Sequence, residues 1–270
     1  MKNYPIKKMS VAGSFYPSQP EKVNQFLGKI LGKPQVLDTS HTPKGKVKAL
    51  IIPHAGWIYS AVVAAKALAE IQNWSKIPRI ILLGPSHFLD FPGVAGGPFS
   101  QMETPLGNIT LDQDSLESFK SPGFYKNWET PYEREHCLEV QLPFLKYLGW
   151  EGTLVPLLFG RTEYVAAGEF LESIRNGDDL IIVSSDLSHF HPYQEARKRD
   201  LSLLDSLIQG DIRGTMEGEA CGMGPLTALM NVAASSRWVP ELLDYRNSGD
   251  TSGDKSRVVG YAALSYWEPL

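Results

Sequence analysis

The fold is decided by the stretch VKALIIPHAG, residues 47–56, in which an apolar run stops at Pro53 and His54 follows at once. A continuous run of leucine and β-branched residues is typical of a strand that is buried on both faces. The same form recurs as RIILLGPSH at residues 79–87 and as LIIVSSDLSH at residues 180–189. Each of the three apolar runs therefore leads directly into polar residues that are capable of catalysis or metal binding.

Segments with the apolar spacing of helices separate these runs. Helices are expected over residues 61–71, 163–175 and 194–209, and further strands over residues 153–159 and 258–266. Helices between buried strands are what a sheet covered on both faces requires. The sequence thus predicts a single α/β domain over residues 1–270, with three layers and a central, largely parallel sheet.

Two segments break this rhythm. Pro156 lies inside the expected strand 153–159 and has no N–H to donate, so we expect an edge position or a bulge there. Residues 93–132 are rich in glycine, proline and aromatic residues. They are expected to form extra strands or an insertion that walls the site.

The composition excludes several classes of protein. The 270 residues carry a net charge of -4 and no basic run, so there is no electrostatic footprint for nucleic acid or an anionic membrane. No apolar stretch approaches the roughly 20 residues of a membrane span, and residues 1–8 lack the apolar core of a signal peptide. Two cysteines do not make a disulfide framework. We therefore expect a soluble cytoplasmic protein with free thiols.

The strand ends indicate a site. In open α/β sheets, ligands bind beyond the carboxyl ends of the strands. Parallel strands would bring His54, His87 and the segment with Asp186 and His189 to the same edge. Several imidazoles that converge at one edge are typical of a metal or proton-transfer site.

Two further segments add candidate ligands. Leucines three or four apart in residues 133–145 indicate a helix, on which His136 and Glu139 would share another face and orient a ligand or provide one. Cys221 lies among small residues just before an expected helix, where a thiolate is stabilised. Two imidazoles with a thiolate suit zinc, copper or iron, so the predicted ligands are His54, His87 and Cys221.

Two polar residues are expected to line the same pocket. Ser86 directly precedes His87, and Asp250 lies in a glycine-containing polar loop that could cover the site and reach a substrate.

These motifs together resemble the Memo protein family, in order and over nearly the whole chain. The matching residues are AGSFYP at 12–17, PHAG at 53–56, GPSH at 84–87, His136 with Glu139, SSD at 184–186 with His189, ACG at 220–222 and TSGD at 251–254.

The resemblance implies the fold of the class III extradiol ring-cleaving dioxygenases, which are non-haem iron enzymes. It also implies a pocket formed by His54, His87, Asp186, His189 and Cys221. By motif, three of these (His54, His87 and Cys221) match residues implicated in copper or iron binding in eukaryotic relatives, which are linked to cell motility signalling and redox chemistry. Prokaryotic members often accompany a radical-SAM protein.

The third ligand distinguishes this chain from the dioxygenases. Those enzymes bind iron through two histidines and a carboxylate. The matching position here carries Cys221, with Glu139 as the alternative, and we expect no cleavage of catechol rings.

Three functions follow. The first is a metal-dependent redox or metal-handling protein that uses iron, copper or zinc on an unknown small molecule. The second is a hydrolase with Cys221 as nucleophile, His189 as base and Asp186 as its orienting group. The third is a non-catalytic module that binds a peptide or protein.

Overall fold

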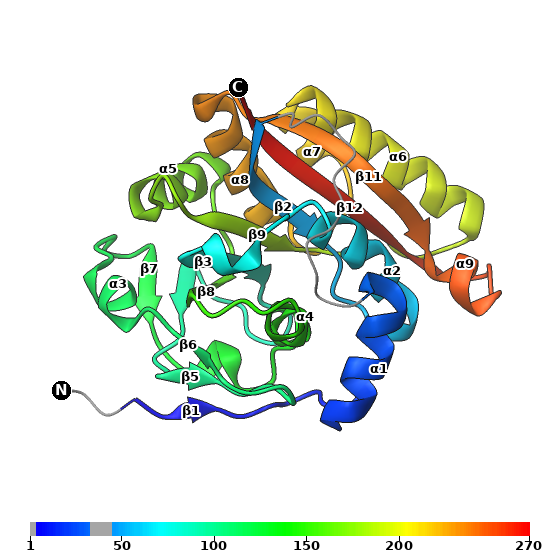
Figure 1. Cartoon of the computed structure of the whole chain (residues 1–270). Coiled ribbons are helices and arrows are strands. Elements are labelled where there is room, and N and C mark those ends of the chain that lie inside the picture. Colours follow the sequence, from blue (N-terminus) through cyan, green and yellow to red (C-terminus); the bar gives the residue numbers. More distant parts are fainter. Residues whose placement is uncertain (1–3, 33–44) are drawn as a thin grey trace.

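A twisted mixed sheet forms the centre of the computed structural model, which describes residues 4–32 and 45–270 (Figure 1). Four parallel strands occupy its middle, in the order β2-β9-β3-β8. Most of their side chains are buried, as their continuous apolar sequences predict. Their bounds are β2 (Gly45–Ile52), β9 (Leu180–Ser184), β3 (Arg79–Pro85) and β8 (Thr153–Phe159).

Antiparallel strands extend the sheet on both sides. Beside β2 lies β12 (Val258–Pro269), which also pairs with β11 (Val239–Asn247) and β10 (His189–His191). Beside β8 lies β4 (Val94–Gly96), which pairs with β7 (Tyr125–Asn127). A separate small sheet combines β1 (Ile6–Lys7), β5 (Gln101–Met102) and β6 (Ile109–Thr110). The expectation that residues 93–132 add strands is confirmed.

Helices cover the sheet, which gives the predicted layers (Figure 1). The helix α2 (Trp57–Leu68) packs against β2, β11 and β12, and α8 (Met223–Ser236) packs against β3 and β9. The other helices are α1 (Pro20–Leu31), α3 (Gln113–Ser118), α4 (Leu142–Tyr147), α5 (Tyr164–Ile174), α6 (Tyr193–Gln209), α7 (Ile212–Met216), α9 (Ser248–Ser252) and the 3₁₀ turns η1 (Trp74–Lys76), η2 (Thr130–Tyr132) and η3 (Glu139–Gln141).

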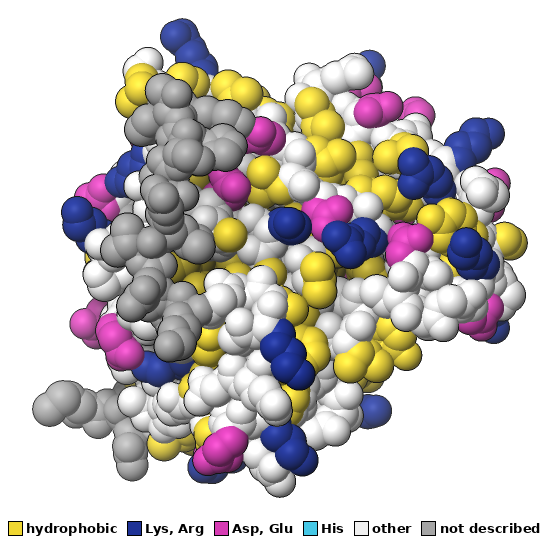
Figure 2. All heavy atoms as spheres, turned by 45° about the vertical axis from the view of Figure 1, so that its right-hand side comes forward, with side chains coloured by type: hydrophobic (Ala, Val, Ile, Leu, Met, Phe, Trp, Pro, Cys, Tyr) yellow, Lys and Arg dark blue, Asp and Glu magenta, His cyan; other side chains and the backbone are white. Residues whose placement is uncertain are grey.

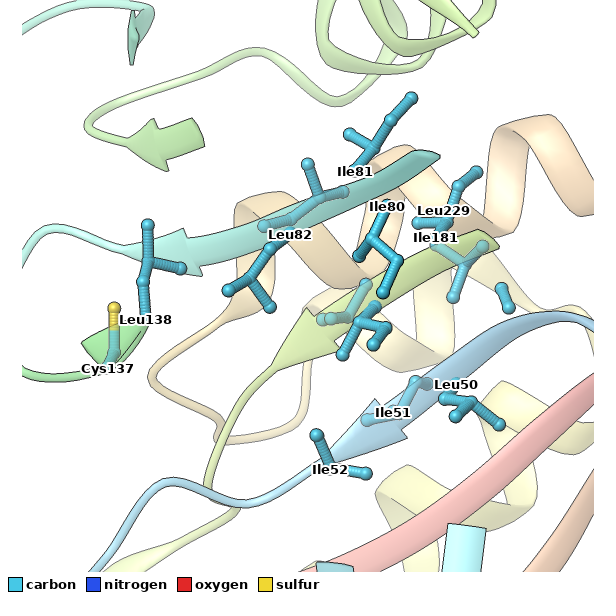
Figure 3. Close-up of a cluster of buried hydrophobic side chains, with 14 of the residues drawn as sticks. Leu50, Ile51, Ile52, Ile80, Ile81, Leu82, Cys137, Leu138, Ile181 and Leu229 are labelled. Atoms are coloured by element: carbon cyan, nitrogen blue, oxygen red, sulfur yellow. The ribbon is translucent and has the colours of Figure 1, made fainter. Parts of the chain in front are cut away.

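Side chains of β2, β3 and β9 form part of the buried core, as Figure 3 shows. Ile80, Ile81 and Leu82 are fully buried, and each such side chain contributes about 1.5–3 kcal/mol through the hydrophobic effect. At the carboxyl end of β3, a Cβ added to Gly84 would lie 2.5 Å from the sulfur of Cys137. Glycine therefore lets the segment around Cys137 approach the end of β3, and this segment carries part of the site.

The expectation that Pro156 marks an edge strand or a bulge is wrong, because neither pairing of β8 has a register shift and the strand has neighbours on both sides. β8 is paired on both sides, with β3 and with β4. However, the pairing with β4 runs only from Leu157 to Phe159, so Pro156 lies just beyond it. The short length of β4 removes the need for an N–H at Pro156.

The surface carries charges of both signs. On the face drawn in Figure 2, acidic and basic side chains are interspersed with hydrophobic ones, without an extended basic patch. Among the helices of the described residues, none has the length and apolar character needed to span a membrane.

Candidate metal centre

The carboxyl ends of β2, β9 and β3 meet at one edge of the sheet, as the sequence predicts. Ile52 at the end of β2 pairs with Ser184 at the end of β9, and β3 lies on the other side of β9. His54 and His87 each lie two residues beyond their strands. The fold therefore brings both histidines together across 33 residues of sequence.

His54, His87 and His136 form what we call the three-histidine cluster. One ring nitrogen of each lies within 4.8 Å of the others, a spacing that could hold a metal ion. The ring centroid of His54 is 5.1 Å from that of His87 and 5.5 Å from that of His136. His54 is buried whereas His87 is exposed, so the cluster opens to solvent on the side of His87.

Hydrogen bonds determine which nitrogen of His54 is protonated. The Ser184 hydroxyl donates its single hydrogen to the carbonyl of Cys137 at 2.7 Å, and it accepts a hydrogen bond from Gln141 Nε2 at 2.9 Å. Its contact with His54 Nδ1 at 3.1 Å must therefore be one in which Nδ1 donates. Nε2 of His54 is left with its lone pair available for a metal.

Glu135 has the same effect on His87. Its carboxylate accepts hydrogen bonds from His87 Nδ1 at 2.9 Å and from the backbone N–H of His87 at 2.6 Å. Burial would raise the pKa of Glu135, but hydrogen bonds from the His87 side chain and from the backbone N–H groups of His87 and Cys137 outweigh it and lower the pKa to about 2. The ionised carboxylate only accepts, so His87 Nδ1 donates and Nε2 remains open. His136 Nδ1 lies 3.3 Å from the same carboxylate.

Burial keeps two of the imidazoles neutral. It lowers the pKa of His54 to about 3 and that of His136 to about 4. A histidine binds metal only in its neutral form. Both rings are therefore ready to coordinate at neutral pH.

Cys221 lies directly against the cluster. Its sulfur is 3.3 Å from Nε2 of His54 and accepts a hydrogen bond from the Asp186 N–H at 3.2 Å. Burial raises the pKa of the thiol above its usual range, with a further contribution from the charge of Asp186. The expectation that the start of α8 stabilises the thiolate is therefore wrong for the metal-free protein, because burial has the larger effect.

Asp186 and His189 lie beside this group. Asp186 Oδ1 accepts the backbone N–H groups of His54 at 2.7 Å and of Ala55 at 3.3 Å. Burial raises the pKa of Asp186. The ring of His189 is near enough to affect both Asp186 and His54 electrostatically, but the described contacts of Cys221 are with His54 rather than with His189.

The helix expected over residues 133–145 is confirmed only from Glu139 onward, as η3 and α4, so His136 and Glu139 do not share a helical face. Residues 133–138 are irregular, with bends and one turn. Glu135 accepts the N–H groups of His136 and Cys137, which holds this irregular segment in place ahead of η3.

Glu139 points away from the cluster, toward the N-terminal segment. Its carboxylate accepts the backbone N–H groups of Ser10 at 2.7 Å and Val11 at 2.9 Å, and the hydroxyl of Tyr16 at 2.7 Å. The same segment places the ring of Phe15 4.6 Å from that of His136. Glu139 thus supports the cluster through the segment that packs on it.

Ser86 and Asp250 have structural contacts. The Ser86 hydroxyl donates to the carbonyl of Leu89 at 2.7 Å, which closes the turn after β3. Asp250 caps α9 by accepting the N–H of Asn247 at 2.9 Å, and it accepts the Tyr193 hydroxyl at 2.7 Å.

Sequence reasoning missed two residues that orient the cluster, Glu135 and Gln141. Glu135 directly precedes His136, and an acid next to a candidate ligand was the one available signal. Gln141 donates to Ser184 and to the carbonyl of Pro53 at 2.8 Å. Nothing in its local sequence distinguishes it from a surface glutamine.

Similarity to known proteins covers almost the whole chain. Residues 7–265 match the family described as Memo-like protein. A MEMO1 family protein of Aquifex aeolicus is 34% identical, over 97% of this chain and 99% of that protein, and one of Ignicoccus hospitalis is 32% identical, over 97% and 98%. The crystal structure of an uncharacterized protein of Escherichia coli K12 shares the fold alone, with a TM-score of 0.53 and 11% identity over 81% of this chain and 99% of that chain. This chain therefore belongs to the Memo-like protein family.

Proposed function

We propose that this protein binds a transition metal ion through the three-histidine cluster and Cys221, and uses it in a redox or metal-handling reaction on a small molecule. One observation carries the proposal: hydrogen bonds occupy Nδ1 of His54 and of His87 and leave a lone pair on Nε2 of each ring, and one nitrogen of each ring lies within 4.8 Å of one nitrogen of His136. Metal-binding histidines in proteins are held in this way, with the second nitrogen donating to an acceptor.

The donor set suits iron, copper or zinc. Imidazole is a ligand for all three, and a sulfur beside it favours soft metals such as copper and zinc. When bound, the ion would supply Lewis acidity and, for iron or copper, one-electron chemistry. Among the described residues, a second group that could hold a metal combines His87 with Glu135 and Cys137, so a carboxylate lies next to the three-histidine cluster. Glu139 bonds to the N-terminal segment instead. That catechol rings are not cleaved stays a prediction, which rests on Cys221.

The surrounding residues provide proton chemistry. Asp186 is buried, which raises the pKa of its carboxyl group, and its backbone N–H donates to Cys221. His189 lies within electrostatic range of Asp186. These two residues are proposed to move protons for a small molecule that enters on the exposed side of His87.

Metal analysis of matched variants tests the proposal. In protein purified without chelators or a metal-carrying tag, His54→Ala, His87→Ala and His136→Ala should each lower metal affinity by at least about 10–100-fold. His191→Ala is the control, because His191 is bonded to Glu219 at 2.7 Å and lies outside the cluster. Full metal occupancy in all three cluster variants would contradict the assignment.

A cysteine hydrolase is the second candidate. The 3.3 Å contact favours a pair of Cys221 with His54, in place of His189 as the base. A nucleophilic cysteine needs a lowered pKa, whereas burial raises that of Cys221. Rapid acylation of Cys221 in metal-free protein, lost in His54→Ala, would favour this candidate over the metal site.

A further inference from the structure

Two phenylalanines near the three-histidine cluster stand apart from all others in the chain. Of eleven phenylalanines, only Phe88 and Phe190 are exposed, by 50% and 60%. Phe88 directly follows His87, and Phe190 directly follows His189. Phenylalanine rings are more often buried than exposed. Two exposed rings next to site histidines therefore indicate a candidate ligand-binding surface.

An arginine side chain stacks on each of these two rings. The guanidinium carbon of Arg134 lies 4.9 Å from the centre of the Phe88 ring, and that of Arg257 lies 5.1 Å from the centre of the Phe190 ring. Both arginines are exposed. Within residues 4–32 and 45–270, neither guanidinium has a hydrogen-bond or ion-pair partner.

A third arginine provides a contrast. Arg175 lies 5.2 Å from the centre of the Trp238 ring, but its guanidinium also bonds to Glu172 and Ser236. The donors of Arg175 are therefore used in structural contacts within the protein. Arg134 and Arg257 have the same stacking and leave their donors free for an anion.

The backbone at Phe190 supports a binding role. Its φ of 62° lies in the left-handed region, which a bulky residue rarely adopts. The register between β10 and β12 shifts at the same place, between His189 and His191. Conformations of this kind persist where the surrounding structure holds them and are common at ligand-binding positions. Here the conformation accompanies a ring that is exposed 5.7 Å from that of His189.

At the other pair, aromatic rings surround a cluster histidine. Phe15 and Phe88 lie 4.6 Å and 6.1 Å from the ring of His136. A flat ligand could stack on such rings, whose offset and edge contacts favour other π-systems. A guanidinium fork matches the two oxygens of a carboxylate.

We propose that the small molecule that binds beside the three-histidine cluster is a planar carboxylate, such as an aromatic or conjugated acid. Its flat part would stack on Phe88 or Phe190, and its carboxylate would pair with Arg134 or Arg257. The location rests on the proposed metal function, but the chemistry of recognition depends only on these four side chains.

Fluorine NMR with 4-fluorobenzoate tests the proposal on the full chain. We expect saturable binding to the native protein, weakened about tenfold or more in Arg134→Gln combined with Arg257→Gln. The neutral probe 4-fluorobenzyl alcohol should bind native protein about tenfold more weakly than the acid. Arg175→Gln is the control and should change the dissociation constant by less than about twofold, since its guanidinium is already bonded.

Two outcomes would overturn the proposal: no binding by native protein at up to about 10 mM acid, or equal binding by the double variant. Metal content measured on the same samples separates this proposal from the metal function. If the protein binds the acid through its arginines but takes up no metal ion, the metal function alone is refuted. Metal binding that persists without recognition of the acid would refute the planar carboxylate alone.

Discussion

The two ends of β3 hold polar groups in opposite ways. At the first residue, Arg79 uses its whole guanidinium: Nε and Nη2 bond to Asp179, Nη1 to Asp112 and Ser115, and Nη2 also to the carbonyl of Ile174. Beyond the last residue, His87 holds Nδ1 in a hydrogen bond and leaves Nε2 open, and the neighbouring His54 beyond β2 does the same. A polar group whose bonds are all internal stabilises the fold, whereas one with an open position can bind a ligand.

The first prediction concerns Arg79, at the end of β3 where all polar groups bond within the protein. Arg79→Met should lower the free energy of unfolding by about 3–5 kcal/mol, because it leaves the buried carboxylate of Asp179 without its partner. Metal affinity should remain within about twofold, since Arg79 lies at the opposite end of the strand. Urea unfolding measures the first quantity and metal titration the second.

Arg199→Met is the matched control, because Arg199 forms an exposed pair with Glu195 that is worth less than about 1 kcal/mol. Equal stability of the two variants would show that the Arg79 network does not hold the fold together.

The second prediction uses acid to distinguish the two ends in metal-free protein. The pKa of His54 is about 3 when folded and near 6.5 when unfolded, so the unfolded chain binds more protons below about pH 6.5. The free energy of unfolding should therefore fall as the pH falls, by about 2 kcal/mol between pH 7 and 5 from His54 alone. Denaturant titrations at each pH measure it.

The groups around Arg79 should contribute nothing to the change in the free energy of unfolding between pH 7 and pH 5. Burial would raise the pKa of Asp112, but hydrogen bonds from Ser115 and Arg79 lower it below its usual value. That carboxylate therefore stays ionised throughout the range from pH 7 to pH 5. If His54→Gln has the same pH dependence as the native protein, the buried neutral imidazole is not the cause.

The sequence predicts the fold and the strand-tip part of the site for the same physical reason. Buried parallel strands have a local apolar signature, and their topology brings His54 and His87 together without further information. The meeting of these two residues is accordingly confirmed by their place in the cluster.

The contribution of His136 follows no such rule. Its position depends on Glu135, whose carboxylate accepts the backbone N–H groups of His87, His136 and Cys137. It depends as well on Gly84, which admits the Cys137 segment. Side-chain bonds between segments 48 residues apart have no periodicity that a single sequence could reveal.

The third prediction concerns Glu135, which orients His87 but is not one of the three histidine ligands. Glu135→Gln should lower metal affinity by about 10–100-fold, because the amide no longer offers His87 a purely accepting partner. Nitrogen NMR should also show His87 losing its preference for a proton on Nδ1, which a merely structural defect would not cause. Glu219→Gln, beside His191, is the control. Unchanged affinity in Glu135→Gln would mean that His87 is not a ligand.

The last prediction concerns the sulfur at the open end. The raised pKa of Cys221 means that the thiol is protonated between about pH 7.5 and 9 in metal-free protein. If Cys221 coordinates, each metal ion must displace one proton, and affinity should rise about tenfold per pH unit in this range. Cys221→Ser should abolish this slope, as measured by calorimetric titration in buffers of different ionisation enthalpy. His54 and His136 cannot produce the slope, because their pKa values of about 3 and 4 lie far below this range. A flat profile in the native protein would make Cys221 a neighbour that hydrogen-bonds to His54, with the three histidines as the complete ligand set.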